Sequence, residues 1–129
     1  GVEGDDAGAI FEALRKLDHR DRLRIYHPVT DAGAEIYVHA KVTIVDDTYL
    51  RVGSSNFNNR SMRLDTECDV MLAAERPGAE ATRATITALR DDLLAEHLAM
   101  TPDQVTQGIK EHGSLIAMPI AARRGRAAP

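Results

Sequence analysis

Two side chains that can act on a phosphate ester, His39 and Lys41, stand two residues apart within one apolar run. The run covers residues 35–45 and is rich in β-branched and aromatic residues, which predicts a strand. Because side chains alternate between the faces of a strand, the imidazole and the ammonium would point the same way, about 7 Å apart along the chain. An imidazole can attack or donate a proton while an ammonium holds an oxygen anion, so the pair suits chemistry on an anionic substrate.

A polar loop follows the next short apolar run, residues 49–52. It begins with Gly53, Ser54, Ser55 and Asn56, which supply a flexible backbone, two hydroxyls and a carboxamide, neutral groups able to surround an anion. Residues 46–48 carry two acids and a threonine and predict the turn of a hairpin. A hairpin places its arms side by side, so the start of the loop can lie near the strand end that carries the histidine.

The residues of the strand and the loop form one motif at fixed spacing. Its members are His39, Lys41, Asp46, Gly53, Ser54 and Asn56. They read H-x-K-x(4)-D and, after six further residues, G-S-x-N, which resembles the HKD motif of the phospholipase D superfamily. At ordinary residue frequencies such a pattern arises by chance about once in ten million starts. The resemblance is close over residues 37–72 and loose over the flanking segments.

The resemblance implies phosphodiester chemistry through a phosphohistidine. In this family one histidine attacks phosphorus, a second protonates the departing alcohol, and the roles reverse when water or another alcohol enters. His39 would take one of these two roles. Lys41 and Asn56 would bind phosphoryl oxygens and stabilise charge in the transition state, and Ser54 would add a hydroxyl to the phosphate site.

Two carboxylates have different expected roles. Glu67, eleven residues past Asn56, stands where the family places the catalytic carboxylate that hydrogen-bonds the far nitrogen of the histidine. Asp46 lies roughly 17 Å beyond Lys41 along an extended chain and has the opposite parity to His39. We therefore expect Asp46 to be a structural member of the motif that caps the hairpin turn through its side chain.

The family's active sites combine two such motifs, whereas this chain contains a single H-x-K. The second motif is expected from an N-terminal half that precedes Gly1 or from the partner of a homodimer. The favoured function is that of a phospholipase D or transphosphatidylase acting on phospholipids or other phosphodiesters. The alternatives are a homodimeric nuclease and an isolated half-domain that binds phosphate without turnover.

Apolar patterning predicts helices on both sides of a β-rich centre. The expected strands cover residues 23–29, 35–45, 49–52 and 67–73, and the expected helices cover about fifteen residues ending near residue 17, residues 79–100 and residues 101–113. This order predicts the α/β class, a mixed β-sheet flanked by helices in an α/β sandwich, and the resemblance implies the same fold. Residues 1–120 would form one domain, and residues 121–129 a disordered basic tail.

Composition narrows the class of partner. Sixteen Lys and Arg against twenty Asp and Glu give a net charge of -4, which argues against nucleic acid. The histidines and the single cysteine, Cys68, show no metal-ligand spacing, and we expect neither a metal nor a cofactor. One cysteine and the absence of a long apolar run fit a cytoplasmic location, with membrane association of the full-length protein implied by the resemblance.

Overall fold

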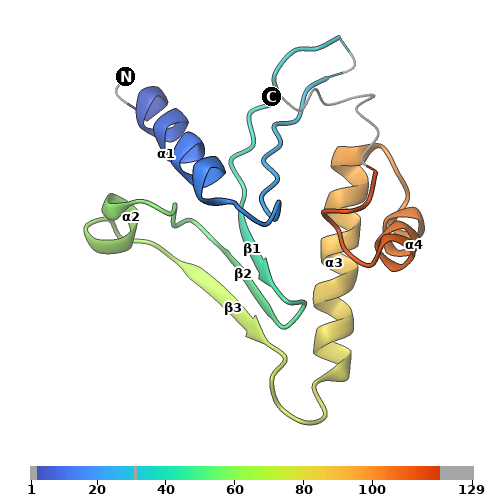
Figure 1. Ribbon diagram of the computed structural model, residues 1–129. Helices are drawn as coiled ribbons and strands as arrows, with labels where there is room; N and C mark the ends of the chain where they lie inside the picture. Colours follow the sequence, from blue (N-terminus) through green and yellow to red (C-terminus); the bar gives the residue numbers. More distant parts are fainter. Residues whose placement is uncertain (1–2, 31, 120–129) are drawn as a thin grey trace.

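The computed structural model describes residues 3–30 and 32–119 and contains four helices and three strands. Their bounds are α1 Glu3–Leu17, β1 Lys41–Val45, β2 Tyr49–Gly53, α2 Asn59–Arg63, β3 Asp69–Ala73, α3 Glu80–Leu98 and α4 Pro102–His112. The predicted α/β class is confirmed (Figure 1), but the sheet of the described residues is antiparallel rather than mixed, because its strands follow one another through a hairpin and a returning loop. The predicted tail, residues 121–129, lies outside the described residues.

The three strands form one antiparallel sheet in the order β1-β2-β3. At one end of the sheet, Lys41 pairs with Gly53 and Gly53 pairs with Asp69. Residues that pair directly across neighbouring strands point to the same side, so these three positions lie on one face of the sheet. The opposite face is apolar and consists of Val42, Ile44, Leu50, Val52, Val70 and Leu72.

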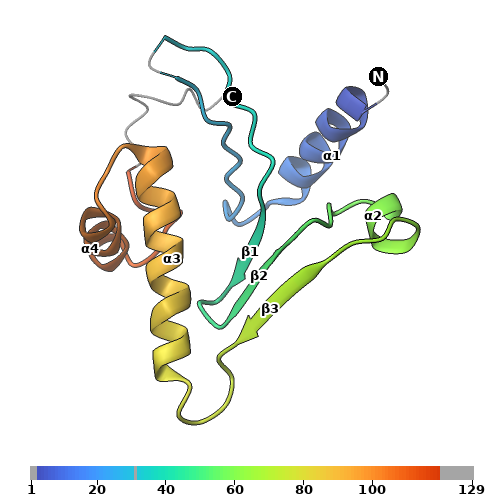
Figure 2. The ribbon, with the colours of Figure 1, turned by 180° about the vertical axis from the view of Figure 1, so that it is seen from behind.

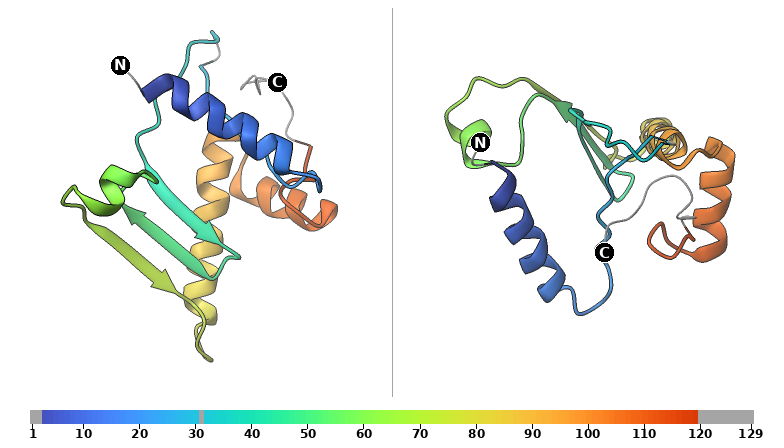
Figure 3. Two further views of the ribbon diagram at one scale, coloured as in Figure 1. Left: turned by 60° about the vertical axis from the view of Figure 1, so that its left-hand side comes forward. Right: turned by 90° about the horizontal axis from the view of Figure 1, so that it is seen from above.

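Helix α3 covers part of this apolar face. Ile86 of α3 is fully buried and packs with Leu50 of β2, and Ile44 of β1 is partly buried against them. Helix α4 packs against α3 and lies on its side away from the sheet, so the layers run sheet, α3, α4 (Figure 3). The face with Lys41 and Asp69 is therefore the one that α3 leaves open.

A chain of polar contacts ties the β1–β2 turn to helices α3 and α4. Arg90 of α3 donates to Asp47 in the turn at 2.6 Å and to the buried Asp91 at 2.8 Å. Thr106 of α4 donates to the other oxygen of Asp91 at 2.5 Å. Burial alone would lower the pKa of Arg90, but its hydrogen bond to Asp91 and the two carboxylate charges outweigh burial and raise it.

Helix α1 stands apart from the sheet and from the α3–α4 pair (Figure 2). Its apolar stripe has the spacing that predicted the helix and consists of Ile10, Phe11, Leu14 and Leu17, all exposed. The uncovered end of the apolar sheet face is exposed too, at Val42, Val52 and Val70. The described residues thus present two apolar surfaces of the kind that mark contacts with further protein.

One predicted strand is absent, and the strands predicted over residues 35–45 and 67–73 begin later in the structure, at Lys41 and Asp69. Residues 23–29 form no strand, and an isolated bridge joins Val29 to Glu35. The predicted strand 35–45 begins only at Lys41, because its partner β2 ends at Gly53, opposite Lys41. Residues 37–40 extend past that end and find no ladder partner among the described residues, so their β propensity is not realised.

We predict that Arg90→Gln lowers the free energy of unfolding by about 2 kcal/mol or more, because it leaves the buried carboxylate of Asp91 without its charge partner. Urea unfolding followed by circular dichroism measures the change. The matched control is Arg24→Gln, which removes an exposed pair with Asp21 and should cost less than about 1 kcal/mol. Equal losses in the two variants would show that the Arg90 contacts do not hold the layers together.

Candidate active site

The two reactive side chains of the motif are in contact. Lys41 Nζ lies 2.8 Å from His39 Nε2 and donates to the carbonyl oxygen of His39 at 2.9 Å. The sequence predicted two groups that point the same way from one strand, about 7 Å apart along the chain; in the structure the histidine precedes the strand and the two side chains touch. Because an ammonium can only donate, Nε2 accepts, and the proton of a neutral ring lies on Nδ1. The nitrogen beside Lys41 thus carries the lone pair.

An aromatic ring covers the histidine. The ring of Tyr37 stacks on the imidazole of His39 with centroids 5.8 Å apart and an interplanar angle of 29°. Tyr37 is itself 85% exposed, so the stack sits on the surface of the described chain. The sequence held a signal for this contact, since Tyr37 and His39 have the same parity in the apolar run.

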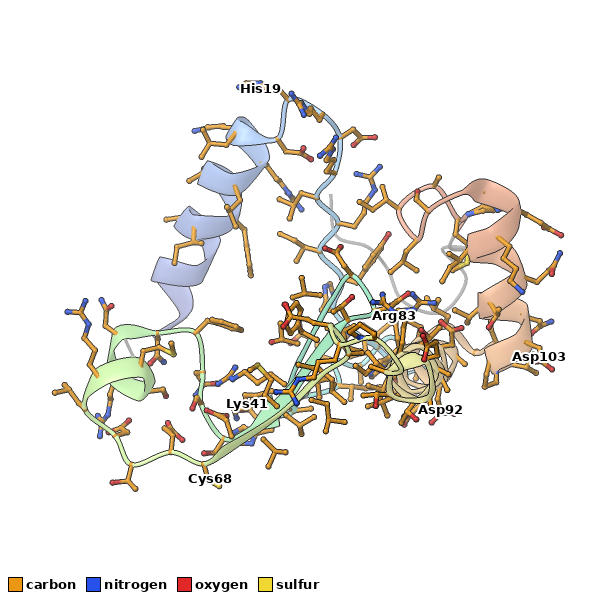
Figure 4. The ribbon with its side chains drawn as sticks, turned by 90° about the horizontal axis from the view of Figure 1, so that it is seen from below. His19, Lys41, Cys68, Arg83, Asp92 and Asp103 are labelled. Atoms are coloured by element: carbon orange, nitrogen blue, oxygen red, sulfur yellow. The ribbon has the colours of Figure 1, made fainter. Side chains whose placement is uncertain are left out.

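The G-S-x-N loop begins directly beside the lysine, as the hairpin prediction required. Gly53 is the register partner of Lys41. Figure 4 labels Lys41 and Cys68 at the same end of the sheet, away from Arg83 and Asp92 of α3. Both arms of the hairpin and the start of β3 therefore bring their polar residues to one end of the open face.

Ser54 links the loop to β3. Its hydroxyl donates to Glu67 Oε2 at 2.6 Å and accepts from the backbone N–H of Cys68 at 3.0 Å, while its own N–H donates to the Cys68 carbonyl at 3.1 Å. The pairing of β2 with β3 thus continues one residue past both strands. The Ser54 hydroxyl therefore links the loop to the residues that precede β3. Its predicted contact with phosphate stays a prediction.

Glu67 lies against Ser54 rather than against the histidine. Among the described residues, its side-chain hydrogen bond goes to the Ser54 hydroxyl, and the expected bond to His39 is not the arrangement found. The reason is the register, since Ser54 sits opposite Cys68 and so brings the neighbouring Glu67 beside it. The catalytic role of Glu67 stays a prediction.

Asp46 lies in the hairpin turn at the other end of β1 from Lys41. Asp46 and Asp47 both have φ of 51°, a left-handed conformation that Asp tolerates better than most residues. The turn is closed by the Thr48 N–H donating to Val45 at 2.9 Å and by the Thr48 hydroxyl donating to the Asp46 carbonyl at 3.0 Å. A structural position is thus observed, but the expected side-chain cap is made by Thr48 instead.

Asn56 is exposed, and its carboxamide makes no hydrogen bond to the described part of the chain. Its backbone is held, because the N–H of Asn58 donates to its carbonyl at 2.9 Å. Asn58 in turn is the N-cap of α2 and accepts from the N–H of Ser61 at 2.8 Å. A fixed backbone with a free carboxamide is what a phosphate ligand needs.

Sequence reasoning missed a cluster beneath the loop. Ser55 is buried, and its hydroxyl donates to Asp69 Oδ2 through a short hydrogen bond. Arg51 pairs with Asp69 at 3.0 Å and donates to the Ser55 carbonyl at 3.2 Å. The hydrogen bond from Ser55, followed by that from Arg51, lowers the pKa of Asp69 against an opposing desolvation. The available signal was an arginine inside the short apolar run 49–52.

The glycine of the motif leaves room for this cluster. A Cβ built on Gly53 would lie 1.7 Å from Asp69 Oδ1 and 2.7 Å from the Asp69 Cα. Gly53 is not among the residues with positive φ, so close approach rather than backbone conformation requires glycine here. Any side chain at Gly53 would displace the Asp69 carboxylate from its place over β2.

Comparison with known proteins decides the family. The profile of the phospholipase D family matches residues 11–113. The chain belongs to the phospholipase D family. It is 43% identical over 72 residues to phospholipase D alpha 1 of Spuriopimpinella brachycarpa and 42% identical over 72 residues to phospholipase D alpha 1 of Zea mays, in each case over 53% of this chain.

Phospholipase D delta of Arabidopsis thaliana is 37% identical over 78 residues, or 56% of the chain. The matched part of the chain spans about 9% of the length of each of these relatives. No solved structure matches the chain significantly.

Two further kinds of feature, a metal centre and a membrane-spanning helix, have no counterpart in the described part of the chain. In the part that the structure describes, no group of three or more His, Cys, Asp or Glu side chains could hold a metal ion. No described helix has the length and apolar character to cross a membrane.

We predict that Gly53→Ala destabilises the protein by about 2 kcal/mol, because the added methyl overlaps both the side chain and the backbone of Asp69. Thermal unfolding measures the loss. Gly8→Ala is the control, since a Cβ there meets nothing within 4 Å and alanine favours a helix. A Gly53→Ala protein as stable as the wild type would contradict the close approach.

A pH dependence follows from Asp69. Its pKa is lower in the folded chain than its ordinary value of 3.8, so its stabilising contribution is complete above that value and is lost as pH falls through the folded pKa. We predict that Asp69→Asn is less stable than the wild type at pH 6.5 and that the difference shrinks in acid. Asp92→Asn, on the exposed side of α3, should match the wild type throughout, and a constant Asp69→Asn difference down to pH 2 would contradict the assignment.

Proposed function

We propose that this chain supplies one histidine motif of a phospholipase D-type active site that hydrolyses or transfers phosphodiesters, with phospholipids as the substrate class. The observation that carries the proposal is the contact of Lys41 Nζ with His39 Nε2 at 2.8 Å, directly beside the glycine that begins the G-S-x-N loop. The membership of the family and the names of its relatives, phospholipases D, support this choice of substrate.

The contact suggests how a substrate would engage the site. A phosphoryl oxygen that accepts from the Lys41 ammonium arrives within reach of His39 Nε2, because the two nitrogens are already neighbours. From there Nε2 can attack phosphorus with its lone pair, breaking the bond to the departing alcohol, or, when protonated, it can give that alcohol its proton. Lys41 and the free carboxamide of Asn56 would stabilise the charge on the other phosphoryl oxygens.

The reaction needs a second histidine, which we propose comes from outside the described residues. Four other histidines occur in the chain. The labelled His19 follows α1 and lies far from Lys41 in Figure 4, and His97 and His112 belong to α3 and α4. His27 lies in the irregular segment before β1 and makes no hydrogen bond to His39 or Lys41 in the described part of the chain. A further part of the same protein, or a second copy of the chain, would complete the pair, and without it the half would bind phosphate and turn nothing over.

Nucleic acid is the less favoured substrate. A nuclease needs a basic groove, because binding to a polyphosphate is dominated by Lys and Arg contacts. The chain carries a net charge of -4, and two of its acids, Glu67 and Asp69, lie beside the motif. A phosphodiester bearing one charge is compatible with this surface, whereas a long polyanion would meet repulsion.

We predict that His39→Ala and Lys41→Ala each reduce turnover of bis(p-nitrophenyl) phosphate by about a thousandfold or more, through loss of the proton-transfer or nucleophilic group and of the oxyanion ligand. Release of p-nitrophenolate measures the rate, and light scattering gives the mass of the active species. Activity should belong to an assembly that holds two histidine motifs.

The matched control is His97→Ala, which removes an exposed histidine of α3 and should leave the rate unchanged. The proposal fails if an active protein keeps its rate after His39→Ala. A monomer of this chain with no turnover, which regains activity when a second motif is supplied, would support the half-site.

A further inference from the structure

Three hydrogen bonds hold Ser55, the residue at the x position of the G-S-x-N pattern. Ser55 lies between Ser54 and Asn56 and is 4% exposed. Its hydroxyl donates to Asp69 Oδ2, its N–H donates to Asp69 Oδ1 at 3.4 Å, and its carbonyl accepts from Arg51 Nη2 at 3.2 Å. The donor groups of Ser55 thus end on Asp69, and its acceptor is taken by Arg51.

The same arginine holds the residue on the other side of Asn56. The guanidinium carbon of Arg51 lies 5.2 Å from the centroid of the Phe57 ring, a cation–π distance. Asn56 is therefore flanked by two residues, Ser55 and Phe57, that both contact Arg51. Its own carboxamide stays exposed, so the clamp acts on its backbone and leaves its side chain free.

The cluster is not arranged for stability alone. Arg51 Nη1 is buried and has no hydrogen-bond partner among the described residues, and a buried donor without a partner costs free energy. An apolar residue at this central position of β2 would avoid that cost and would suit a strand better. What an apolar residue could not do is hold the carboxylate of Asp69 and the carbonyl of Ser55 together.

We propose that Asp69 and Arg51 are positioning residues of the phosphate-binding loop, which fix Ser55 and thereby hold the neighbouring Asn56, whose carboxamide would bind a phosphoryl oxygen. The inference rests on the proposed function, since it assigns Asn56 to a phosphoryl oxygen. Neither residue belongs to the H-x-K-x(4)-D or G-S-x-N pattern.

The physical benefit is preorganisation. A loop with glycine, two serines and an asparagine would otherwise lose conformational entropy each time it closed on a ligand. The contacts of Asp69 and Arg51 meet that cost during folding, and the carboxamide then needs only a side-chain adjustment to bind. Losing either contact should therefore weaken phosphate binding more than it weakens the fold.

The test is a titration of the chain with inorganic phosphate, followed through the side-chain NMR signal of Asn56, with hydrogen exchange at the Ser55 N–H as a second measurement. We expect Asp69→Asn and Arg51→Gln to raise the dissociation constant for phosphate about tenfold and to speed exchange at Ser55. Unchanged signals from α3 and α4 would verify that each variant is folded.

Two controls separate positioning from general stability. Asp65→Asn removes another Asp–Arg pair, with Arg60 on α2 at 2.9 Å, and should leave both measurements unchanged. Asp47→Asn weakens the tie between the turn and α3 and should reduce stability without changing the affinity for phosphate.

The result that overturns the proposal is wild-type affinity in Asp69→Asn and Arg51→Gln while Lys41→Ala loses binding, because the phosphate site would then exist without the clamp. Equal loss of affinity in Asp47→Asn would also overturn it, by showing that any destabilisation has the same effect. If Lys41→Ala binds phosphate like the wild type, phosphate lies elsewhere, and the proposed function fails together with the positioning role.

Discussion

The close approach of Asp69 to the backbone of Gly53 is the constraint on which the rest of the site depends. The Asp69 carboxylate occupies the space where any residue other than glycine would carry a side chain. Gly53 also lies between the two charged residues of its row, Lys41 and Asp69. On one side of Gly53 the ammonium of Lys41 is free to reach His39. On the other side the carboxylate holds the loop. One end of the sheet thus carries an ammonium that contacts the histidine and a carboxylate that is engaged in internal contacts.

Helix α3 holds the sheet from the apolar face, opposite the face that carries Lys41 and Asp69. The buried contact of Leu50 with Ile86 fixes the sheet on α3, and Arg90 joins Asp47 in the hairpin turn to the buried Asp91. These contacts lie at the far end of the hairpin from Lys41, so the lysine of the motif stands at an end of the sheet that α3 does not cover. Residues 37–40, which include the histidine, continue beyond the sheet itself.

The sequence predicts the parts of the structure that depend on local pattern. Helix α1 follows from its apolar spacing, α4 from the capping box of Thr101 and Gln104, and the hairpin from its two β-rich runs. The extent of residues 35–45 as a strand could not be predicted, because it depends on where β2 ends. The partner of Glu67 and the cluster of Arg51 and Asp69 depend on the register of β2 with β3, which short-range pattern does not specify.

The central claim, that one phosphate site lies between His39, Lys41 and Asn56, is tested most directly by a crystal structure of the protein grown with tungstate, a tetrahedral anion that stands in for phosphate. The account predicts an anion within hydrogen-bond distance of His39 Nε2 and Lys41 Nζ, with the Asn56 carboxamide turned towards it. Tungstate bound only at other surfaces, with the contact of Lys41 and His39 left intact, would contradict the account.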